Sequence, residues 1–183
     1  MTIPLTSKSR EMKIERIWAM PNAWTFSIKP IKQLLAEEMN TNKEVWLDPF
    51  AGKYSPAQYK NDLNGSMNAQ DHEDALVWLK KRKEADGVLL DPPYSLRQVS
   101  EHYKKAGIKV TGWHTSMAWG SRIKDEVARI VKPGGKVICF GWNSMGLGKN
   151  RGFKMERILL VAHGGSKNDT IVTVEKKIQS KLL

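Results

Sequence analysis

Apolar residues recur along this chain in two patterns, one helical and one continuous. Apolar side chains spaced three and four residues apart predict amphipathic helices, and short continuous apolar runs indicate buried strands. In chain order these patterns predict helix 28–39, strand 45–47, helix 71–83, strand 87–90, helix 119–131 and strand 136–140. The first two strands each stop at an Asp-Pro pair, where proline restricts the backbone and lacks the N–H group of a strand residue.

Three further segments complete the predicted elements. Residues 96–105 have helical character, and Lys132-Pro133-Gly134-Gly135 ends the third helix and turns the chain. Two β-rich runs, 154–161 and 170–176, are joined by a glycine-containing segment. They predict an antiparallel hairpin at the end of the chain.

The order of these elements predicts one α/β domain. Residues 1–20 are polar and basic and are expected to be mobile in part, whereas residues 21–183 contain no repeat or linker that would divide them. Strands that alternate with helices favour a mainly parallel sheet with helices on both faces. Ligands of such sheets bind beyond the carboxyl ends of the strands. The two Asp-Pro turns therefore predict where the functional site lies.

Charge and composition narrow the classes of protein. Of 183 residues, 30 are Lys or Arg and 19 are Asp or Glu, so the net charge is +11, which favours a polyanionic partner, with nucleic acid first. A Lys-rich surface that serves only solubility is the alternative.

The hydrophobic content of 40% excludes a disordered chain. No apolar run approaches the ~20 residues of a membrane helix, and the first residues lack the apolar stretch of a secretory signal, so a soluble, cytoplasmic protein is expected. Cys139 stands alone, which excludes an internal disulfide and a Cys-rich metal site, and no metal is expected.

The segment Asp91-Pro92-Pro93-Tyr94 directly follows the second apolar strand. Its two prolines remove two N–H donors and fix the backbone, so the turn presents carbonyl oxygens and one carboxylate. Such acceptors suit an amino group with two hydrogens, and the neighbouring aromatic ring offers a stacking face for a planar base. These residues therefore indicate a pocket for an exocyclic amine of a nucleobase. A rigid turn with Tyr94 packed in the core is the alternative interpretation.

This tetrapeptide resembles the D-P-P-Y motif of amino-group methyltransferases that use S-adenosylmethionine, especially the N6-adenine DNA methyltransferases. The resemblance implies that Asp91 and the Pro92 carbonyl hold the target amine and that Tyr94 stacks on a base flipped out of the duplex. Transfer would then be a direct attack of the nitrogen on the methyl group. The two hydrogen bonds that the amine donates to these oxygen atoms stabilise the positive charge that develops on its nitrogen. The resemblance also implies the Rossmann-like class I methyltransferase fold, whose sheet ends in an antiparallel hairpin.

A second match concerns the cofactor. The run Asp48-Pro49-Phe50-Ala51-Gly52 resembles the D-P-F-A-G cofactor motif of the same family, which implies that this backbone lies against the methionine portion of S-adenosylmethionine. Upstream, residues 21–31 resemble the segment that closes over that methionine, with Thr25, Phe26 and Pro30 as candidate contacts. A helix that begins with proline in its first turn explains the upstream segment equally well.

The chain departs from the family after Gly52. The usual second glycine and full helix are replaced by residues 53–62, in which Ser55-Pro56 can start about one helical turn. Lys53 and Tyr54 stand where small residues are usual and are expected to narrow the pocket. Asp62 is a candidate for the acid that bonds the ribose hydroxyls, and it can equally cap a turn.

The substrate and partner predictions depend on what surrounds these motifs. A target-recognition domain is missing, which leaves room for a homodimer or for a partner that supplies specificity, although no residue pattern shows either. DNA is preferred over RNA as the nucleic acid. An RNA base methyltransferase acting on adenine N6 or guanine N2, and a catalytically silent nucleic-acid-binding subunit, are the alternatives. Three glycines at 146, 148 and 152 suggest a flexible loop that closes over substrate. Candidate nucleic-acid contacts are Arg97, Lys104, Lys105, Lys109, Trp113, His114, Lys149, Arg151 and Lys154.

Overall fold

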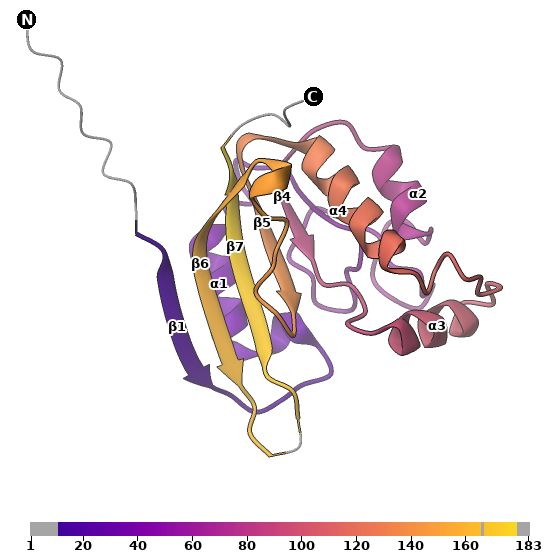
Figure 1. Cartoon of the computed structure of the whole chain (residues 1–183), viewed down its shortest axis with the longest axis horizontal. Coiled ribbons are helices and arrows are strands. Elements are labelled where there is room, and N and C mark those ends of the chain that lie inside the picture. Colours follow the sequence, from indigo (N-terminus) through magenta and orange to yellow (C-terminus); the bar gives the residue numbers. More distant parts are fainter. Residues whose placement is uncertain (1–10, 166, 179–183) are drawn as a thin grey trace, which may run out of the picture.

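A single mixed sheet organises the computed structural model, which describes residues 11–165 and 167–178 (Figure 1). Within these residues the strand order is β1-β6-β7-β5-β4-β2-β3. Strand β7 runs antiparallel to β5 and β6, and the other strand pairs are parallel. The strands are β1 (Lys13–Trp18), β2 (Trp46–Asp48), β3 (Tyr59–Lys60), β4 (Ala85–Leu90), β5 (Val131–Gly141), β6 (Phe153–Ala162) and β7 (Thr170–Lys177). The predicted α/β class, parallel sheet and closing hairpin are confirmed.

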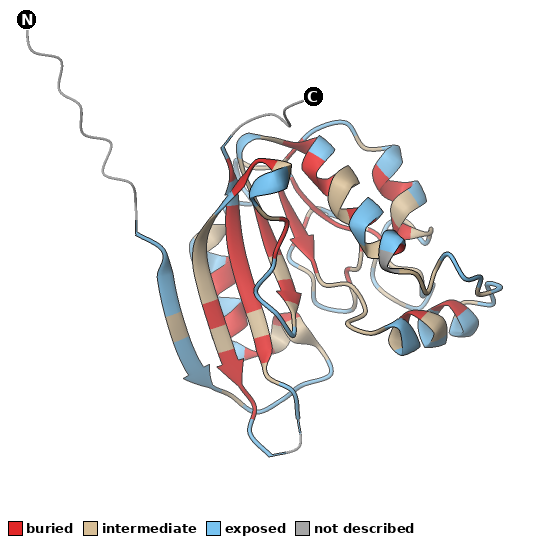
Figure 2. Ribbon diagram, in the orientation of Figure 1, coloured by how far each residue is buried: buried red, intermediate tan, exposed pale blue. Residues whose placement is uncertain are grey.

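Helices cover both faces of this sheet, as predicted. The helical elements are η1 (Thr25–Ser27), α1 (Lys29–Glu38), α2 (Ala75–Lys80), α3 (Leu96–Lys105), α4 (Met117–Ile130) and η2 (Lys149–Arg151). On one face α1 packs Ile31 and Leu34 against Leu89 and Ile138 of the inner strands. On the other face α2, α3 and α4 form the second core, and Figure 2 shows the buried residues running along these central strands. No helix in the described part of the chain is long and apolar enough to cross a bilayer.

Two helical predictions differ from the structure. The helix expected over residues 71–83 is limited to Ala75–Lys80, because Asp71 bridges to Asn61 and the Asp74 side chain caps the helix by accepting from the Val77 N–H group. The short helix expected at Ser55-Pro56 does not form. The Ser55 hydroxyl instead donates to the buried Asp48 carboxylate at 2.6 Å, and the chain continues in extended form into β3.

The N-terminal segment is ordered in part by pairing with β6. Residues 13–18 of the basic segment 1–20 form the edge strand β1, whereas residues 1–10 lie outside the described residues. Arg157 on β6 bonds Glu15 of β1 at 2.6 Å and Glu37 of α1 at 2.7 Å. These ion pairs tie the edge strand to the helix behind the sheet. Sequence pattern did not indicate β1 because it lies mostly exposed and lacks a buried face.

Candidate active site

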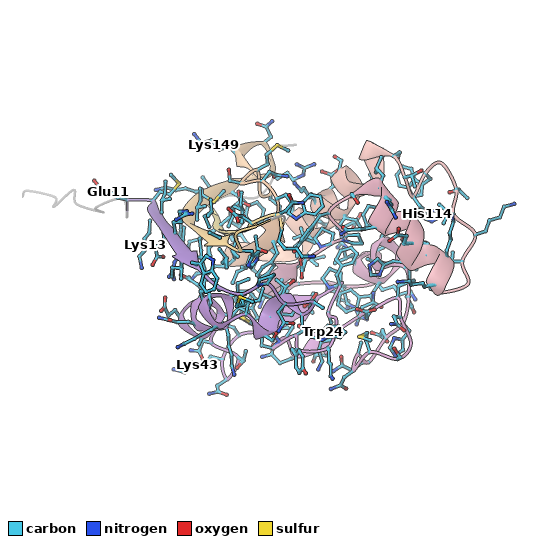
Figure 3. All side chains as sticks on the ribbon, turned by 90° about the horizontal axis from the view of Figure 1, so that it is seen from below. Glu11, Lys13, Trp24, Lys43, His114 and Lys149 are labelled. Atoms are coloured by element: carbon cyan, nitrogen blue, oxygen red, sulfur yellow. The ribbon has the colours of Figure 1, made fainter. Side chains whose placement is uncertain are left out.

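A pocket of about 330 Å³ opens at the carboxyl ends of β2 and β4, where the two Asp-Pro turns meet. Figure 3 looks onto this end of the sheet, with Trp24 near the middle of the view. Segments far apart in sequence line the pocket together, because parallel strands bring their carboxyl ends to one edge. The predicted site residues in its wall are Thr25, Phe26, Pro49, Phe50, Ala51, Gly52, Asp62, Asp91, Pro92, Pro93 and Tyr94.

Two predicted site residues do not line the pocket, namely Asp48 and Pro30, which is buried in the first turn of α1. Asp48 is fully buried, accepts the Phe50 N–H group at 2.9 Å, and accepts the Ser55 hydroxyl at 2.6 Å. Burial raises the pKa of Asp48 from 3.8 to about 7, and the charges of Asp91 and Asp62 act in the same direction. Asp48 therefore orders the turn that follows β2, and its position favours an indirect role in ligand binding.

The turn at residues 49–52 is fixed by Asp62. Gly52 adopts a left-handed φ of 54° and donates its N–H group to Asp62 Oδ2 at 2.8 Å. The other carboxylate oxygen accepts the N–H group of Asn64 at 2.8 Å. A carboxylate offers about four lone-pair sites, so these two bonds do not use its whole acceptor capacity. Asp62 thus holds the turn and lies in the pocket wall, and its predicted role toward a ribose stays a prediction.

Aromatic side chains form the rim where Lys53 and Tyr54 were expected to narrow the pocket. The rings of Trp24 and Tyr54 meet edge to face at 6.0 Å, and Lys53 lies over Tyr54 at 5.3 Å. Tyr54 is 49% exposed, so this group borders the opening. The residues that replace the usual small ones therefore build an aromatic rim and leave a cavity beneath it.

Asp91, Tyr94 and Thr25 lie together in the wall of the pocket. The Tyr94 hydroxyl donates to Asp91 Oδ1. Burial raises the pKa of Asp91 to about 6, although the hydroxyls of Tyr94 and Thr25 oppose that rise. Burial and the adjacent Asp91 carboxylate raise the pKa of Tyr94. The arrangement is a desolvated carboxylate with one oxygen bound by the Tyr94 hydroxyl.

Several pocket residues were not predicted from the sequence, because they lie in helices and short connecting segments that have no recognisable motif. Trp119 at the start of α4 packs edge to face on Phe50 at 6.0 Å and near Tyr103 of α3 at 6.5 Å. The Tyr94 N–H group donates to Gln98 Oε1 at 2.7 Å, which fixes the turn after the two prolines. The remaining wall residues are Ala23, Trp24, Lys53, Tyr54, Asn61, Leu63, Asn64, Met67, Glu73, Ala75 and His102.

The predicted nucleic-acid contacts differ in whether other residues of the protein already bind them. Lys104, Lys105 and Lys109 are exposed at the end of α3 and just beyond it. Arg151 is engaged instead, since it bonds Asp125 at 2.9 Å and the Ser121 hydroxyl at 2.9 Å. Arg151 thus joins η2 to α4 and is not available as a free cation.

The glycine-rich loop between β5 and β6 is fastened to the sheet, contrary to the expectation of a flexible closing loop. Buried Glu175 accepts the N–H groups of Leu147 at 2.5 Å and Gly148 at 3.0 Å. Lys124 of α4 donates to the Gly146 carbonyl at 2.6 Å. A Cβ atom on Gly146 would overlap the Glu175 carboxylate. Glycine at this position therefore permits a close approach of backbone to carboxylate.

Replacing Asp48 with Asn is expected to change how stability depends on pH. A carboxyl group whose pKa is raised from 3.8 to about 7 on folding contributes stability below its ordinary pKa, and that stability is lost as the pH rises through about 7. The difference in free energy of unfolding, variant minus unsubstituted protein, should grow by about 2 kcal/mol between about pH 5 and about pH 8. Urea denaturation of both proteins at the two pH values measures it. A difference that stays constant over this range would contradict the assigned burial effect.

Comparison with known proteins establishes the fold. No protein-family model and no curated protein matches the sequence. TrmN from Thermus thermophilus superposes with a TM-score of 0.51 and 18% identity, over 82% of this chain and 49% of that chain. The putative methylase HI0767 from Haemophilus influenzae gives a TM-score of 0.50 and 14% identity, over 82% of this chain and 98% of that chain.

A third match is SMU.776, a putative methyltransferase complexed with SAH, with a TM-score of 0.52 and 10% identity over 79% of this chain and 48% of that chain. The chain thus spans about half the length of TrmN and of SMU.776. At these identities the likeness concerns the arrangement of the backbone. The seven-stranded sheet, with β7 inserted antiparallel and helices on both faces, is the Rossmann-like methyltransferase fold.

Proposed function

We propose that this protein is an S-adenosylmethionine-dependent methyltransferase that acts on an exocyclic amino group of a nucleobase, with adenine N6 in DNA as the first candidate substrate. One observation carries the proposal. The acceptor group of Asp91, Pro92 and Tyr94 opens into the same pocket as the turn at 49–52 and Asp62. A site for an amine and a site for a methyl donor are therefore side by side, as direct transfer requires.

The residues of the pocket fit S-adenosylmethionine in chemistry. Asp62 contributes a carboxylate to the wall, which suits the hydroxyl groups of a ribose as hydrogen-bond donors, whereas the Glu73 carboxylate is paired with Lys81 at 2.6 Å. Trp24, Phe50 and Trp119 offer aromatic surface, which suits an adenine ring and a sulfonium centre. When bound, this cofactor supplies an electrophilic methyl group.

The protein's own groups would act on the amine. The second Asp91 oxygen and the Pro92 carbonyl would accept the two N–H groups of the amine, which would leave the nitrogen lone pair free to face the methyl donor. The Asp91 carboxylate would stabilise the positive charge that develops on this nitrogen during transfer. Because its pKa is about 6, the same carboxylate would then accept the proton that the methylated amine releases.

The net charge of +11 supports a polyanionic substrate. Exposed lysines at the end of α3 are placed to meet a phosphate backbone, and such contacts position a nucleic acid without reading its sequence. RNA remains the second candidate, because the amine chemistry is the same on both polymers.

Two measurements test the proposal. Calorimetry with S-adenosylhomocysteine should show binding to the protein, and isotope-labelled S-adenosylmethionine should label DNA or RNA offered in parallel. Mass spectrometry of the digested product should identify N6-methylated adenosine, as the deoxyribonucleoside if DNA is the substrate or as the ribonucleoside if RNA is. The absence of cofactor binding at millimolar concentration would contradict the enzyme assignment and favour a silent nucleic-acid-binding subunit. N4-methylcytosine or N2-methylguanosine would correct the base and retain the chemistry.

A further inference from the structure

Tyr94 is poorly placed to stack on a substrate base. Its hydroxyl is bound to the Asp91 carboxylate, and its ring packs against the core on the α1 side of the sheet. The hydroxyl bond and the core contact together hold the ring in this position. The turn therefore supplies acceptors for an amine, but its tyrosine is already engaged in positioning the carboxylate.

Trp142 lies next to this group because of strand register. In the parallel pair β4–β5, Leu90 lies opposite Cys139, so the residues that follow Leu90 run alongside those that follow Cys139. The rings of Trp142 and Tyr94 meet at 5.4 Å with an interplanar angle of 66°. With this contact made, Trp142 is still 43% exposed. An accessible aromatic side chain thus lies next to Tyr94 of the acceptor group.

The backbone that carries Trp142 is held in place. Asn143 Oδ1 accepts the Met145 N–H group at 3.0 Å, and beyond it Glu175 and Lys124 bind the loop at Leu147, Gly148 and Gly146. A large exposed aromatic side chain on a fixed backbone loses little conformational entropy when a ligand stacks on it. Its exposure is therefore better explained by a ligand than by a mobile loop.

We infer that Trp142 is the stacking surface for an unpaired nucleobase presented to Asp91, so that the protein binds single-stranded nucleic acid where Trp142 contacts the pocket residue Tyr94. The inference rests on the proposed function and deepens it, because it specifies an unstacked strand as the substrate class. Base stacking on aromatic side chains is independent of the sugar, and its strength is about 1–3 kcal/mol per base. That range corresponds to about a 5- to 150-fold change in affinity.

The test uses a short single-stranded oligoadenylate, in DNA and RNA forms, and the full chain saturated with S-adenosylhomocysteine. Stacking should quench part of the tryptophan fluorescence as the oligonucleotide is added. Trp142→Phe should lose this quenching and keep most of the affinity, because phenylalanine still stacks. Trp142→Ala should weaken binding about tenfold and raise the KM for the oligonucleotide, with cofactor affinity unchanged within twofold.

The matched control is Trp18, which is 61% exposed and lies on the edge strand β1, separated from β5 by β6 and β7. Trp18→Phe and Trp18→Ala should bind and quench like the unsubstituted protein. The inference is overturned if Trp142→Ala binds within twofold of the unsubstituted protein, if the Trp18 variants lose the quenching instead, or if neither oligonucleotide binds. Because quenching needs no methyl transfer, Trp142-dependent binding without transfer would support this inference and contradict the proposed function.

Discussion

Replacing Asp91 with Ala is expected to lower the rate of methyl transfer by about 10²- to 10³-fold, the usual effect of removing one group that stabilises transition-state charge. The substitution removes the carboxylate that accepts from Tyr94 and faces the amine site. Cofactor affinity should change by less than about threefold in calorimetry, because Asp62 and the turn at 49–52 remain intact. Single-turnover measurements with labelled S-adenosylmethionine separate the rate of transfer from binding.

Glu101→Ala is the matched control for Asp91→Ala. Glu101 lies on α3 and forms an exposed ion pair with Arg97 at 2.8 Å, away from the pocket wall. Exposed pairs of this kind contribute little to stability, so this variant should transfer methyl groups at the unsubstituted rate. Activity that survives Asp91→Ala would contradict the role of Asp91 in holding the amine.

The same carboxylate predicts the pH dependence of the rate. Because the ionised form accepts the amine and the pKa of Asp91 is raised to about 6, the rate should rise with pH and level off above about 6. The hydroxyl of Tyr94 lowers the pKa of Asp91, so Tyr94→Phe should move the midpoint of this profile to higher pH. An unchanged or lowered midpoint would show that the Tyr94–Asp91 bond does not set the ionisation of the site.

Replacing Gly87 with Ala is expected to lower the free energy of unfolding by about 3 kcal/mol, at the upper end of the usual cost of overpacking a core. Gly87 on β4 lies opposite Trp46 on β2, and a Cβ atom there would overlap the Trp46 indole. The ring cannot easily move, because it is fully buried and its Nε1 donates to Glu44 Oε2 at 2.9 Å. Urea denaturation measures the loss as a lower midpoint.

Gly120→Ala is expected to change the free energy of unfolding in the opposite direction. It serves as the control for the general effect of replacing a glycine. Gly120 lies within α4, and a Cβ atom there meets nothing within 4 Å. Alanine in a helix interior should raise the free energy of unfolding by about 0.5–1 kcal/mol, because it restricts the unfolded chain. If Gly87→Ala were no more destabilising than Gly120→Ala, the close packing of Trp46 on Gly87 would be wrong.

The sequence determined the elements whose apolar pattern is local. Helix α1, the buried strands β2 and β4, and the hairpin β6–β7 lie where the periodicity predicted them, within a few residues. Strand β5 begins at Val131, five residues earlier than predicted, and so includes the Lys132-Pro133-Gly134-Gly135 segment that was expected to be a turn. The position of the pocket was also predictable, because Asp48-Pro49 and Asp91-Pro92 both follow strands that run parallel in one sheet. Residue types and their spacing suffice for such features, since each depends on neighbours along the chain.

Tertiary structure alone decided the features that depend on distant partners. Strand β1 has no buried face of its own, so its place depends on pairing with β6 and on the ion pair of Glu15 with Arg157. The burial of Asp48 likewise follows from strands and helices that pack around it. Because it is buried, Asp48 stabilises the turn after β2, although the sequence predicted that it contacts the ligand. No local window of sequence contains these partners.

The same reason explains the chemistry of the site. The bond from the Tyr94 hydroxyl to Asp91 is local, since the two residues are three positions apart in the sequence, but the contact of Tyr94 with Trp142 arises only when the ends of β4 and β5 lie side by side. Likewise, the glycine-rich segment is fixed because Glu175, from the adjacent β7, reaches its backbone. The sequence by itself thus determined the buried central strands and the acceptor turn, whereas long-range packing decided the edge strand β1 and which side chains remain available to a substrate.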